Sequence, residues 1–197
     1  MEIVVENPAP TLITVRDLIT EETAAYLRDC VDKRGKDTAY NGNPSTREFR
    51  LGGFEQMGFM GVGGAEDARD MHTISVLEEV IRPLKDQIEI AYKNTALEKI
   101  LGHRGFWVMR YGEGGAFDEH VDWSLENDEN STPAVATMCI NIGGDYEGGQ
   151  KSVGGQRVFA PYLGAEIHDG WTFHSVNPVT RGNRYIVCVH FLGTLKS

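Results

Sequence analysis

Apolar residues near the start of the chain repeat with the period of an α-helix. Between positions 24 and 31 they recur every three or four residues, which is the spacing of one buried helix face. Thr20 precedes this stretch as a residue that can cap the first turn, and Glu21 and Glu22 place negative charge at the N-terminus of the helix. Gly35 follows as a stop signal. The pattern therefore predicts a helix between Thr20 and Gly35.

The strongest helical pattern covers residues 73–100. Its apolar side chains fall on one stripe, as in an amphipathic helix that packs one face on a core. The stripe consists of Val76, Leu77, Val80, Ile81, Leu84, Ile88 and Ala91. Pro83 lies inside it and lacks the backbone N–H that a helix interior uses, so the sequence predicts a kink or two abutting helices.

The stretch between the two helical patterns, residues 36–70, is polar and rich in glycine. We expect one strand within it, at Thr46–Leu51, and an earlier strand before the first helix, at Thr11–Val15. Long segments without secondary structure are uncommon in compact domains and are often binding loops or disordered segments. Both readings stay open for the remainder of this stretch, either a lid over a substrate site or a disordered segment.

After Gly102 the pattern changes from helical spacing to short segments rich in β-branched and aromatic residues. Gly, Pro, Asn and Asp separate these segments, as expected at turns between strands. The predicted strands are Phe106–Tyr111, Val135–Ile142, Gln156–Phe159, Gly164–Ile167 and Arg184–Phe191. A run of strands after a helical front predicts an antiparallel β-sandwich or barrel supported by helices.

The charge of the chain excludes some classes of partner. Its 197 residues carry 29 acidic and 19 basic side chains, which gives a formal net charge of −10. Lys and Arg are scattered along the chain, whereas a nucleic-acid-binding protein concentrates them in a patch that displaces phosphate counterions. No apolar stretch approaches the roughly 18–20 residues that span a bilayer. We therefore predict no nucleic-acid partner and no membrane partner.

The cysteines and the N-terminal segment give an expectation about the compartment. Cys30, Cys139 and Cys188 are odd in number, widely spaced and without a C-x-x-C pair, which is typical of reduced thiols. The first residues lack the basic and apolar regions of a signal peptide. We therefore expect a cytoplasmic protein, and the length favours one domain over residues 1–197.

A His-x-Asp triplet in the strand-rich half is the first candidate for chemistry. On an extended strand, His120 and Asp122 would point to the same face with Cα atoms about 7 Å apart, so their side chains can converge on one metal ion. A third ligand has to come from elsewhere in the chain. His174 and His168 are the rivals, and the residues that follow His174 favour it, because they end in Arg184 ten residues later.

An arginine at the start of an apolar strand is costly to bury unless an anion meets it. Arg184 therefore suggests an anionic ligand between the strands. Two histidines and one carboxylate form the facial triad of non-haem Fe(II) oxygenases, which leaves coordination positions open. A 2-oxo acid and dioxygen can take these positions, and an arginine can bind the distal carboxylate of the 2-oxo acid through a bidentate fork.

These residues belong to a larger ordered set, which resembles the 2-oxoglutarate/Fe(II)-dependent dioxygenase superfamily, and within it the prolyl 4-hydroxylase-like branch. The resemblance covers about residues 104–192 and extends more loosely into the helical front. The set consists of Arg110-Tyr111-Gly112, Phe117, His120-Val121-Asp122, Glu147-Gly148-Gly149 and the run from His174 to Arg184.

The resemblance implies a fold and a set of ligands. The fold is an α+β, mainly β double-stranded β-helix (jelly roll), with a helical front over about residues 18–100 and a jelly-roll core over about residues 104–192. The implied iron ligands are His120, Asp122 and His174. The implied residues for 2-oxoglutarate are Arg184, for its C5 carboxylate, and Tyr111, whose hydroxyl would help to hold it; Asn141 stands where prolyl hydroxylases tend to carry a tyrosine near that carboxylate.

The activity implied by the resemblance is hydroxylation of an aliphatic C–H bond, with Fe(II) as cofactor, 2-oxoglutarate and dioxygen as cosubstrates, and ascorbate as a supporting reductant. Related halogenases carry a small residue in place of the metal-binding carboxylate, so Asp122 favours hydroxylation. A prolyl residue in a peptide or protein is the implied substrate. The net charge disfavours the nucleic-acid demethylases that share this fold.

Several alternatives stay open on the sequence alone. The substrate can instead be a free amino acid or another small molecule, and a β-sandwich binding module with a vestigial metal site would be no enzyme at all. A cupin-type metalloenzyme is disfavoured by the single H-x-D triplet and the distal arginine.

His190 shares a strand face with Arg184 and is read as a buried imidazole or as part of the cavity lining, whereas His72 and His103 are expected at the surface. Trp123 and the acidic residues after it are candidates for the rim of the pocket.

Overall fold

The computed structural model describes residues 2–6, 12–40, 43–51, 68–122 and 132–196. Its two helices are α1 (Glu21–Arg34) and α2 (Ala68–Ala91). Its strands in the first half are β1 (Glu2–Glu6), β2 (Leu12–Arg16), β3 (Lys36–Tyr40), β4 (Asn43–Leu51), β5 (Leu97–His103), β6 (Phe106–Tyr111) and β7 (Phe117–His120). The later strands are β8 (Ala134–Gly143), β9 (Tyr146–Gly148), β10 (Lys151–Val153), β11 (Gln156–Val158), β12 (Ala165–Asp169), β13 (His174–Val176), β14 (Val179–Gly182) and β15 (Arg184–Leu195).

Helix α1 begins and ends where the sequence predicts. The side chain of Thr20 accepts a hydrogen bond from the backbone N–H of Thr23 (3.2 Å), and the N–H of Gly35 donates to the carbonyl of Val31 (3.0 Å). Leu27 and Val31 are among the fully buried residues of its apolar face. The predicted helix is therefore confirmed, together with the mechanism that starts and stops it.

Helix α2 is shorter than its apolar pattern. It passes through Pro83 without dividing, and this residue lies on the exposed side of the helix. The prediction that the helical pattern extends to residue 100 is wrong, because a turn follows at Tyr92 and β5 begins at Leu97. Pairing with β15 gives the backbone of β5 its hydrogen-bond partners, so this segment forms a strand and not a continuation of the helix.

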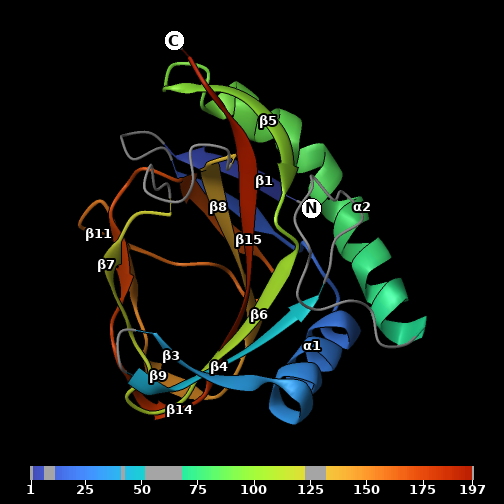
Figure 1. Ribbon diagram of the computed structural model, residues 1–197, viewed down its shortest axis with the longest axis vertical. Coiled ribbons are helices and arrows are strands. Elements are labelled where there is room, and N and C mark those ends of the chain that lie inside the picture. Colours follow the sequence, from blue (N-terminus) through green and yellow to red (C-terminus); the bar gives the residue numbers. More distant parts are fainter. Residues whose placement is uncertain (1, 7–11, 41–42, 52–67, 123–131, 197) are drawn as a thin grey trace.

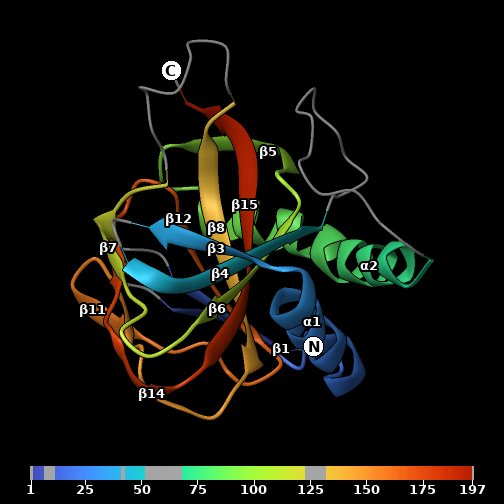
Figure 2. The ribbon, with the colours of Figure 1, turned by 60° about the horizontal axis from the view of Figure 1, so that its bottom comes forward.

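The strands form a two-sheet sandwich, which confirms the predicted jelly-roll architecture. The large sheet has nine strands in the order β1-β2-β12-β8-β15-β6-β4-β3, with β5 paired to β15. A four-stranded sheet in the order β11-β10-β13-β7 faces it, and β14 and β9 form a two-stranded sheet. Figures 1 and 2 show the two helices on one side of the large sheet and β7 and β11 on the other side.

The segment expected as a loop contains an antiparallel hairpin. Strands β3 and β4 pair with each other, and β4 pairs with β6, so the hairpin extends the large sheet. The prediction of a strand at Thr46–Leu51 is confirmed, whereas the loop expected at the start of the 36–70 stretch is wrong. Residues 52–67, where a lid was expected, lie outside the described residues.

Alternation along β15 separates the core into two parts. Val187 and Val189 belong to the main cluster between the helices and the large sheet, whereas Ile186 and Cys188 belong to a smaller cluster between the two sheets. Arg184 stands on the same side as Ile186, because side chains two residues apart share a face. The space between the sheets is therefore partly polar. Within the described residues, neither helix is long and apolar enough to cross a membrane.

A buried carboxylate joins the two helices. Asp70 of α2 has no exposed surface, and it accepts hydrogen bonds from Tyr26 (2.8 Å) and from two nitrogens of Arg34 (2.7 and 2.9 Å), both on α1. A buried charge of this kind is tolerated because it is paired and hydrogen-bonded. The contact fixes α2 against α1 on the outer face of the large sheet.

We expect that Asp70→Ala destabilises the protein by about 3 kcal/mol, because it leaves the Arg34 guanidinium partly buried without its partner. Urea unfolding followed by circular dichroism measures this change. The matched control is Lys33→Ala, which removes an exposed pair with Asp29 (2.8 Å) and should cost less than about 0.5 kcal/mol. Equal losses in the two variants would show that the buried pair has no special part in holding the helices.

Candidate metal centre

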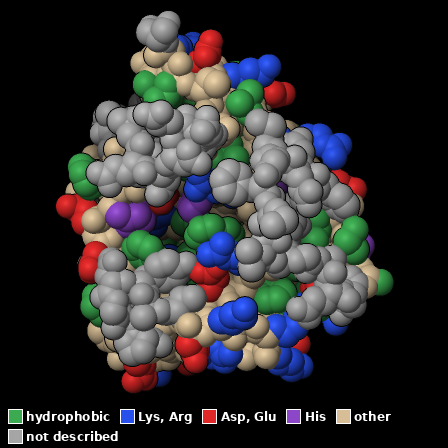
Figure 3. All heavy atoms as spheres, in the orientation of Figure 1, with side chains coloured by type: hydrophobic (Ala, Val, Ile, Leu, Met, Phe, Trp, Pro, Cys, Tyr) green, Lys and Arg blue, Asp and Glu red, His purple; other side chains and the backbone are tan. Residues whose placement is uncertain are grey.

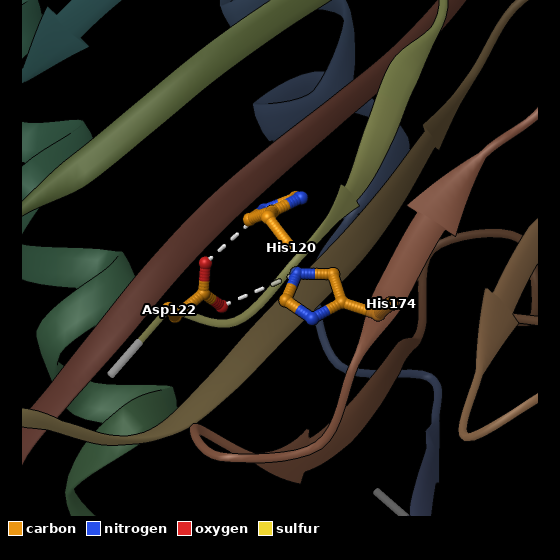
Figure 4. A group of neighbouring side chains, drawn as sticks. All are labelled: His120, Asp122 and His174. Carbon is orange, nitrogen blue, oxygen red and sulfur yellow. Dashed lines mark ion pairs between the residues drawn. The ribbon is translucent and has the colours of Figure 1, made fainter. Parts of the chain in front are cut away.

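Three side chains from two neighbouring strands converge between the sheets. In the β7–β13 pair, His120 lies opposite His174, and Asp122 follows two residues after the end of β7. Asp122 Oδ1 is 3.4 Å from His120 Nε2, and Asp122 Oδ2 is 3.4 Å from His174 Nε2 (Figure 4). One potential ligand atom from each of the three residues lies within 4.8 Å of the other two. The structure thus brings together the triad that the sequence suggested, and this group could hold a metal ion.

Backbone carbonyls orient the two imidazoles. His120 Nδ1 is 2.7 Å from the carbonyl oxygen of Asp118, and His174 Nδ1 is 3.1 Å from that of Thr172. A carbonyl oxygen only accepts, so each Nδ1 carries a proton and donates it to this bond, and Nε2 is the nitrogen that faces Asp122. This is the arrangement in which histidine binds a metal.

The ionisation states also suit a metal ligand set. Burial lowers the pKa of His174 to about 3, so its imidazole is neutral at physiological pH. Burial alone would raise the pKa of Asp122, but the hydrogen bond with His120 and the nearby imidazoles outweigh it and hold this pKa well below its usual range. Thr137 on β8 donates a hydrogen bond to Asp122 Oδ2. Two imidazoles, of which His174 is neutral, beside an ionised, oriented carboxylate fit the donor set of Fe(II) oxygenases.

Two further imidazoles surround Asp122. His168 Nε2 lies 4.0 Å from Asp122 Oδ2, and His190 Nε2 lies 3.8 Å from Asp122 Oδ1. The rival of His174 is therefore adjacent to the triad, although His168 is not part of the group within 4.8 Å. Figure 3 shows histidine side chains in a hollow on the face of the molecule viewed in Figure 1.

Of the two histidines predicted at the surface, His72 and His103, the structure confirms one. His72 is exposed, as expected. The prediction for His103 is wrong, because this residue is 3% exposed and its Nε2 is 3.0 Å from Glu78 Oε1. A carboxylate from α2 thus satisfies an imidazole of β5, a pairing between elements that local sequence does not reveal. Trp123 and the acidic residues after it lie outside the described residues. The three cysteines are free and buried.

Arg184 lies in the neighbouring part of the space between the sheets. It is 7% exposed, its guanidinium carbon is 5.4 Å from the ring centre of Tyr111, and Nη1 is buried without a hydrogen-bond partner among the described residues. Gly149 leaves room for it, because a Cβ there would come within 3.0 Å of Arg184 Cδ. A buried guanidinium nitrogen without a partner is the feature that a bound carboxylate would satisfy.

Tyr111 and Asn141 are placed near Arg184 but are already engaged. Tyr111 pairs with Arg184 in the β6–β15 register, and its hydroxyl lies 3.7 Å from the sulfur of Met109. Burial raises the pKa of Tyr111, so its hydroxyl stays protonated and can donate. The Asn141 amide donates to the carbonyl of Ala160 and accepts from the N–H of Gly143, both at 2.9 Å. Asn141 is therefore fixed by backbone partners beside the cavity.

A cavity of about 640 Å³ adjoins Arg184. It is lined by residues of β9, β10 and β11 and of the loops that follow these strands, and by Asn141, Glu166 and Arg184. Lys151 also lines it, and its ammonium group pairs with Glu166 Oε1 and lies 3.1 Å from Cys139 Sγ. Besides this Lys–Glu pair, the charged side chains in the lining are Glu147, Arg157 and Arg184.

Sequence reasoning missed Lys151 and Glu166, although a signal was present. Glu166 and His168 stand two residues apart on a short strand, on either side of the apolar Ile167, so both face the same side. Lys151 is 6% exposed, and nearby carboxylate and thiol groups raise its pKa against the opposing effect of burial. The pKa of Glu166 is lowered, because Lys151 and His168 outweigh its burial. Both members of the pair are therefore charged.

The comparisons with known proteins follow this geometry. No protein-family profile matches the chain. It is 30% identical over 183 residues to a PKHD-type hydroxylase of Paracoccus denitrificans, covering 88% of this chain and 74% of that protein. It is 32% identical over 139 residues to a PKHD-type hydroxylase of Pseudomonas fluorescens, a match that covers 62% of this chain and 61% of the relative's length.

Solved structures with the same fold are more distant in sequence. A collagen prolyl hydroxylase of Paramecium bursaria Chlorella virus-1, in its 2OG complex, has a TM-score of 0.64 at 14% identity, covering 93% of this chain and 95% of that one. A prolyl-4-hydroxylase of Pseudomonas putida has a TM-score of 0.57 at 13% identity, covering 90% and 89%. At these identities the likeness establishes the fold, and the jelly-roll prediction is confirmed.

Removing the carboxylate at the centre of the triad should impair metal binding. We expect that Asp122→Ala weakens Co(II) binding by more than about 100-fold, because the loss of a ligand exceeds the effect of losing an outer-shell partner. Isothermal titration calorimetry of the metal-free protein with Co(II) measures the affinity. The control is Asp145→Ala, since the side chain of Asp145 is 91% exposed. Similar affinities for wild type and Asp122→Ala would contradict the assignment of the site.

Thr137→Val should weaken Co(II) binding by about 10-fold, because valine keeps the shape of threonine but cannot donate to Asp122 Oδ2. The same titration measures the effect. An affinity equal to that of the wild type would show that the hydroxyl has no part in orienting the carboxylate.

Proposed function

The chain belongs to the PKHD-type hydroxylase family, and we propose that it works as a 2-oxoglutarate- and Fe(II)-dependent dioxygenase that hydroxylates an aliphatic C–H bond. The observation that carries this proposal is the convergence of two imidazoles and one carboxylate within 4.8 Å. A cavity elsewhere between the sheets is lined by Arg184, whose Nη1 has no hydrogen-bond partner among the described residues. A metal ion and an organic anion are the two ligands that such a site needs.

In this proposal Fe(II) would be held by three side-chain atoms, which are Nε2 of His120, a carboxylate oxygen of Asp122 and Nε2 of His174. Fe(II) bound there would activate dioxygen. The overall reaction couples conversion of 2-oxoglutarate to succinate and CO2 with hydroxylation of the substrate. The chain's own part is to fix the three ligands on one side of the ion. Carbonyl oxygens hold both imidazoles, and Thr137 holds the carboxylate, so the remaining positions stay open for exchangeable ligands.

Arg184 binds the distal carboxylate of 2-oxoglutarate in this proposal. Its planar fork can donate two parallel hydrogen bonds, and burial strengthens them because water does not compete. The ring of Tyr111 lies against the guanidinium and restricts its orientation. The protonated Tyr111 hydroxyl can turn from the sulfur of Met109 to donate to the same carboxylate.

A prolyl residue in a peptide or protein is the proposed substrate. Support comes from the names of solved structures with this fold, among them a prolyl hydroxylase of Trichoplax adhaerens in complex with a hypoxia-inducible-factor peptide fragment, with a TM-score of 0.63 at 14% identity. The net charge of −10 argues against nucleic acid. A free amino acid or other small molecule is the alternative, and the cytoplasmic location stays a prediction.

Purified protein should release succinate from 2-oxoglutarate when Fe(II), dioxygen and ascorbate are present, and Asp122→Ala should not. A succinate assay by mass spectrometry measures the product. Release that is equal in wild type and Asp122→Ala would contradict the proposed reaction. The substrate class is then tested by adding proline-containing peptides, free amino acids or oligonucleotides. Stimulation by peptides alone supports a prolyl substrate, and stimulation by oligonucleotides alone overturns it.

Arg184→Ala should raise the KM for 2-oxoglutarate by about 10- to 100-fold, since hydrogen bonds to charged groups contribute roughly 1.5–3 kcal/mol. Its Co(II) affinity should stay within about two-fold of the wild type, because a KM change from lost carboxylate binding does not involve the metal ligands. Arg181→Ala is the control, as this arginine is 58% exposed and pairs with Glu147 at 2.9 Å. Equal losses of metal affinity and cosubstrate binding would contradict the role of Arg184.

A further inference from the structure

His168 has a buried ring nitrogen that no described residue satisfies. The residue has no exposed surface, and its Nε2 has no hydrogen-bond partner among the described residues. This nitrogen faces the metal centre, 4.0 Å from Asp122 Oδ2, and the His168 ring centre is 4.5 Å from that of His174. A buried polar atom without a partner is costly, so its occurrence beside a ligand site indicates a missing partner.

The other ring nitrogen of His168 is held firmly. Nδ1 lies 3.1 Å from Glu166 Oε2 and 3.5 Å from Lys151 Nζ. Glu166 is ionised and accepts only, and it is the nearer of the two, so Nδ1 carries the proton and donates to it. Nε2 is then the ring nitrogen that faces the metal centre, as it is in His120 and His174, whose Nδ1 atoms face backbone carbonyls.

The Lys151–Glu166 pair fixes the orientation of His168. A buried ion pair contributes little net stability compared with apolar packing, and here it lies in the space between two sheets. Glu166 contacts the imidazole and Lys151 neutralises Glu166, so together they fix one orientation of His168 without adding net charge. Both also line the cavity that contains Arg184, which places His168 between that cavity and Asp122.

We propose that His168 is a further positioning residue of the metal centre, whose Nε2 accepts a hydrogen bond from water bound at the metal, with Glu166 and Lys151 fixing its orientation. The proposal assigns His168 no direct bond to the metal, which would be held by His120, Asp122 and His174. A water molecule bound at the metal can donate a hydrogen bond to a side chain that does not itself bind the metal. The inference rests on the proposed function for the presence of the metal.

The test uses the full chain with Co(II) alone, so that it does not depend on turnover. His168→Phe should weaken Co(II) binding by about 10-fold, the range for an outer-shell partner. Its visible Co(II) absorption should become stronger, because loss of a bound water lowers the coordination number. His168→Gln places an amide oxygen near the position of Nε2 and should restore the wild-type spectrum.

The matched control is His103→Phe, which removes another buried imidazole paired with a carboxylate, Glu78, outside the metal centre. Its Co(II) spectrum should equal that of the wild type. If His168→Phe and wild type have the same Co(II) spectrum and affinity, the inference is overturned. If the phenylalanine variant does not fold, His168→Leu takes its place: stronger Co(II) absorption than wild type supports the inference, whereas the wild-type spectrum overturns it.

Two further measurements separate the possible failures. Electron paramagnetic resonance of the Cu(II) protein should count two histidine nitrogens in wild type and in His168→Gln, and a third nitrogen in wild type would overturn the outer-shell role. Addition of 2-oxoglutarate to the wild-type Co(II) protein should change its spectrum. A wild type that binds Co(II) but does not respond to 2-oxoglutarate contradicts the proposed function, independently of the result for His168.

The positioning pair is tested with a double variant. Lys151→Met with Glu166→Leu removes both charges, so that neither is left buried without its partner. This variant should reproduce the Co(II) spectrum of His168→Phe, because the imidazole loses the partner that fixes its tautomer. A spectrum equal to that of wild type would show that the pair does not position His168.

Discussion

The buried carboxylate of Asp122 is the group on which the rest of the centre depends. Only 8% of its side chain is exposed, and an isolated ionised carboxylate at such a position would be very costly. Thr137 donates to it, and four imidazoles stand around it with nitrogens 3.4 to 4.0 Å away. His174 is neutral, so this imidazole does not compensate the charge of the carboxylate. A bound cation is the partner that this environment favours.

Charge is distributed unevenly along the space between the sheets. Asp122 supplies a negative charge near one end, Lys151 and Glu166 cancel each other in the middle, and Arg184 leaves a positive charge beside the cavity. A divalent cation at the triad and a carboxylate at Arg184 would compensate both ends. The proposed cosubstrate has two carboxylates, and a carboxylate is the group that the Arg184 guanidinium would bind.

The two faces of the large sheet differ in polarity, and the apolar packing on the outer face offsets the cost of a polar space between the sheets. The outer face packs on α1 and α2 and holds the main apolar cluster, which includes Leu27, Leu77 and Val187. Among the described residues, most of the buried apolar side chains belong to this main cluster, and a smaller cluster that includes Ile186 and Cys188 lies between the sheets. Long strands such as β15 serve both purposes, because successive side chains alternate between the two faces.

Local patterns in the sequence determined α1 with its Thr20 cap, the strands at Phe106–Tyr111 and Arg184–Phe191, and the H-x-D triplet with His174 and Arg184 as candidates. These features depend on spacing along the chain, which a sequence displays directly. Tertiary structure alone decided where α2 ends, that β3 and β4 extend the sheet, that Glu78 buries His103, and that Lys151 and Glu166 hold His168 towards Asp122. Each of these depends on backbone or side-chain partners from a distant part of the chain. The residues around a given position do not show which distant partner it will meet, so local sequence does not predict such contacts.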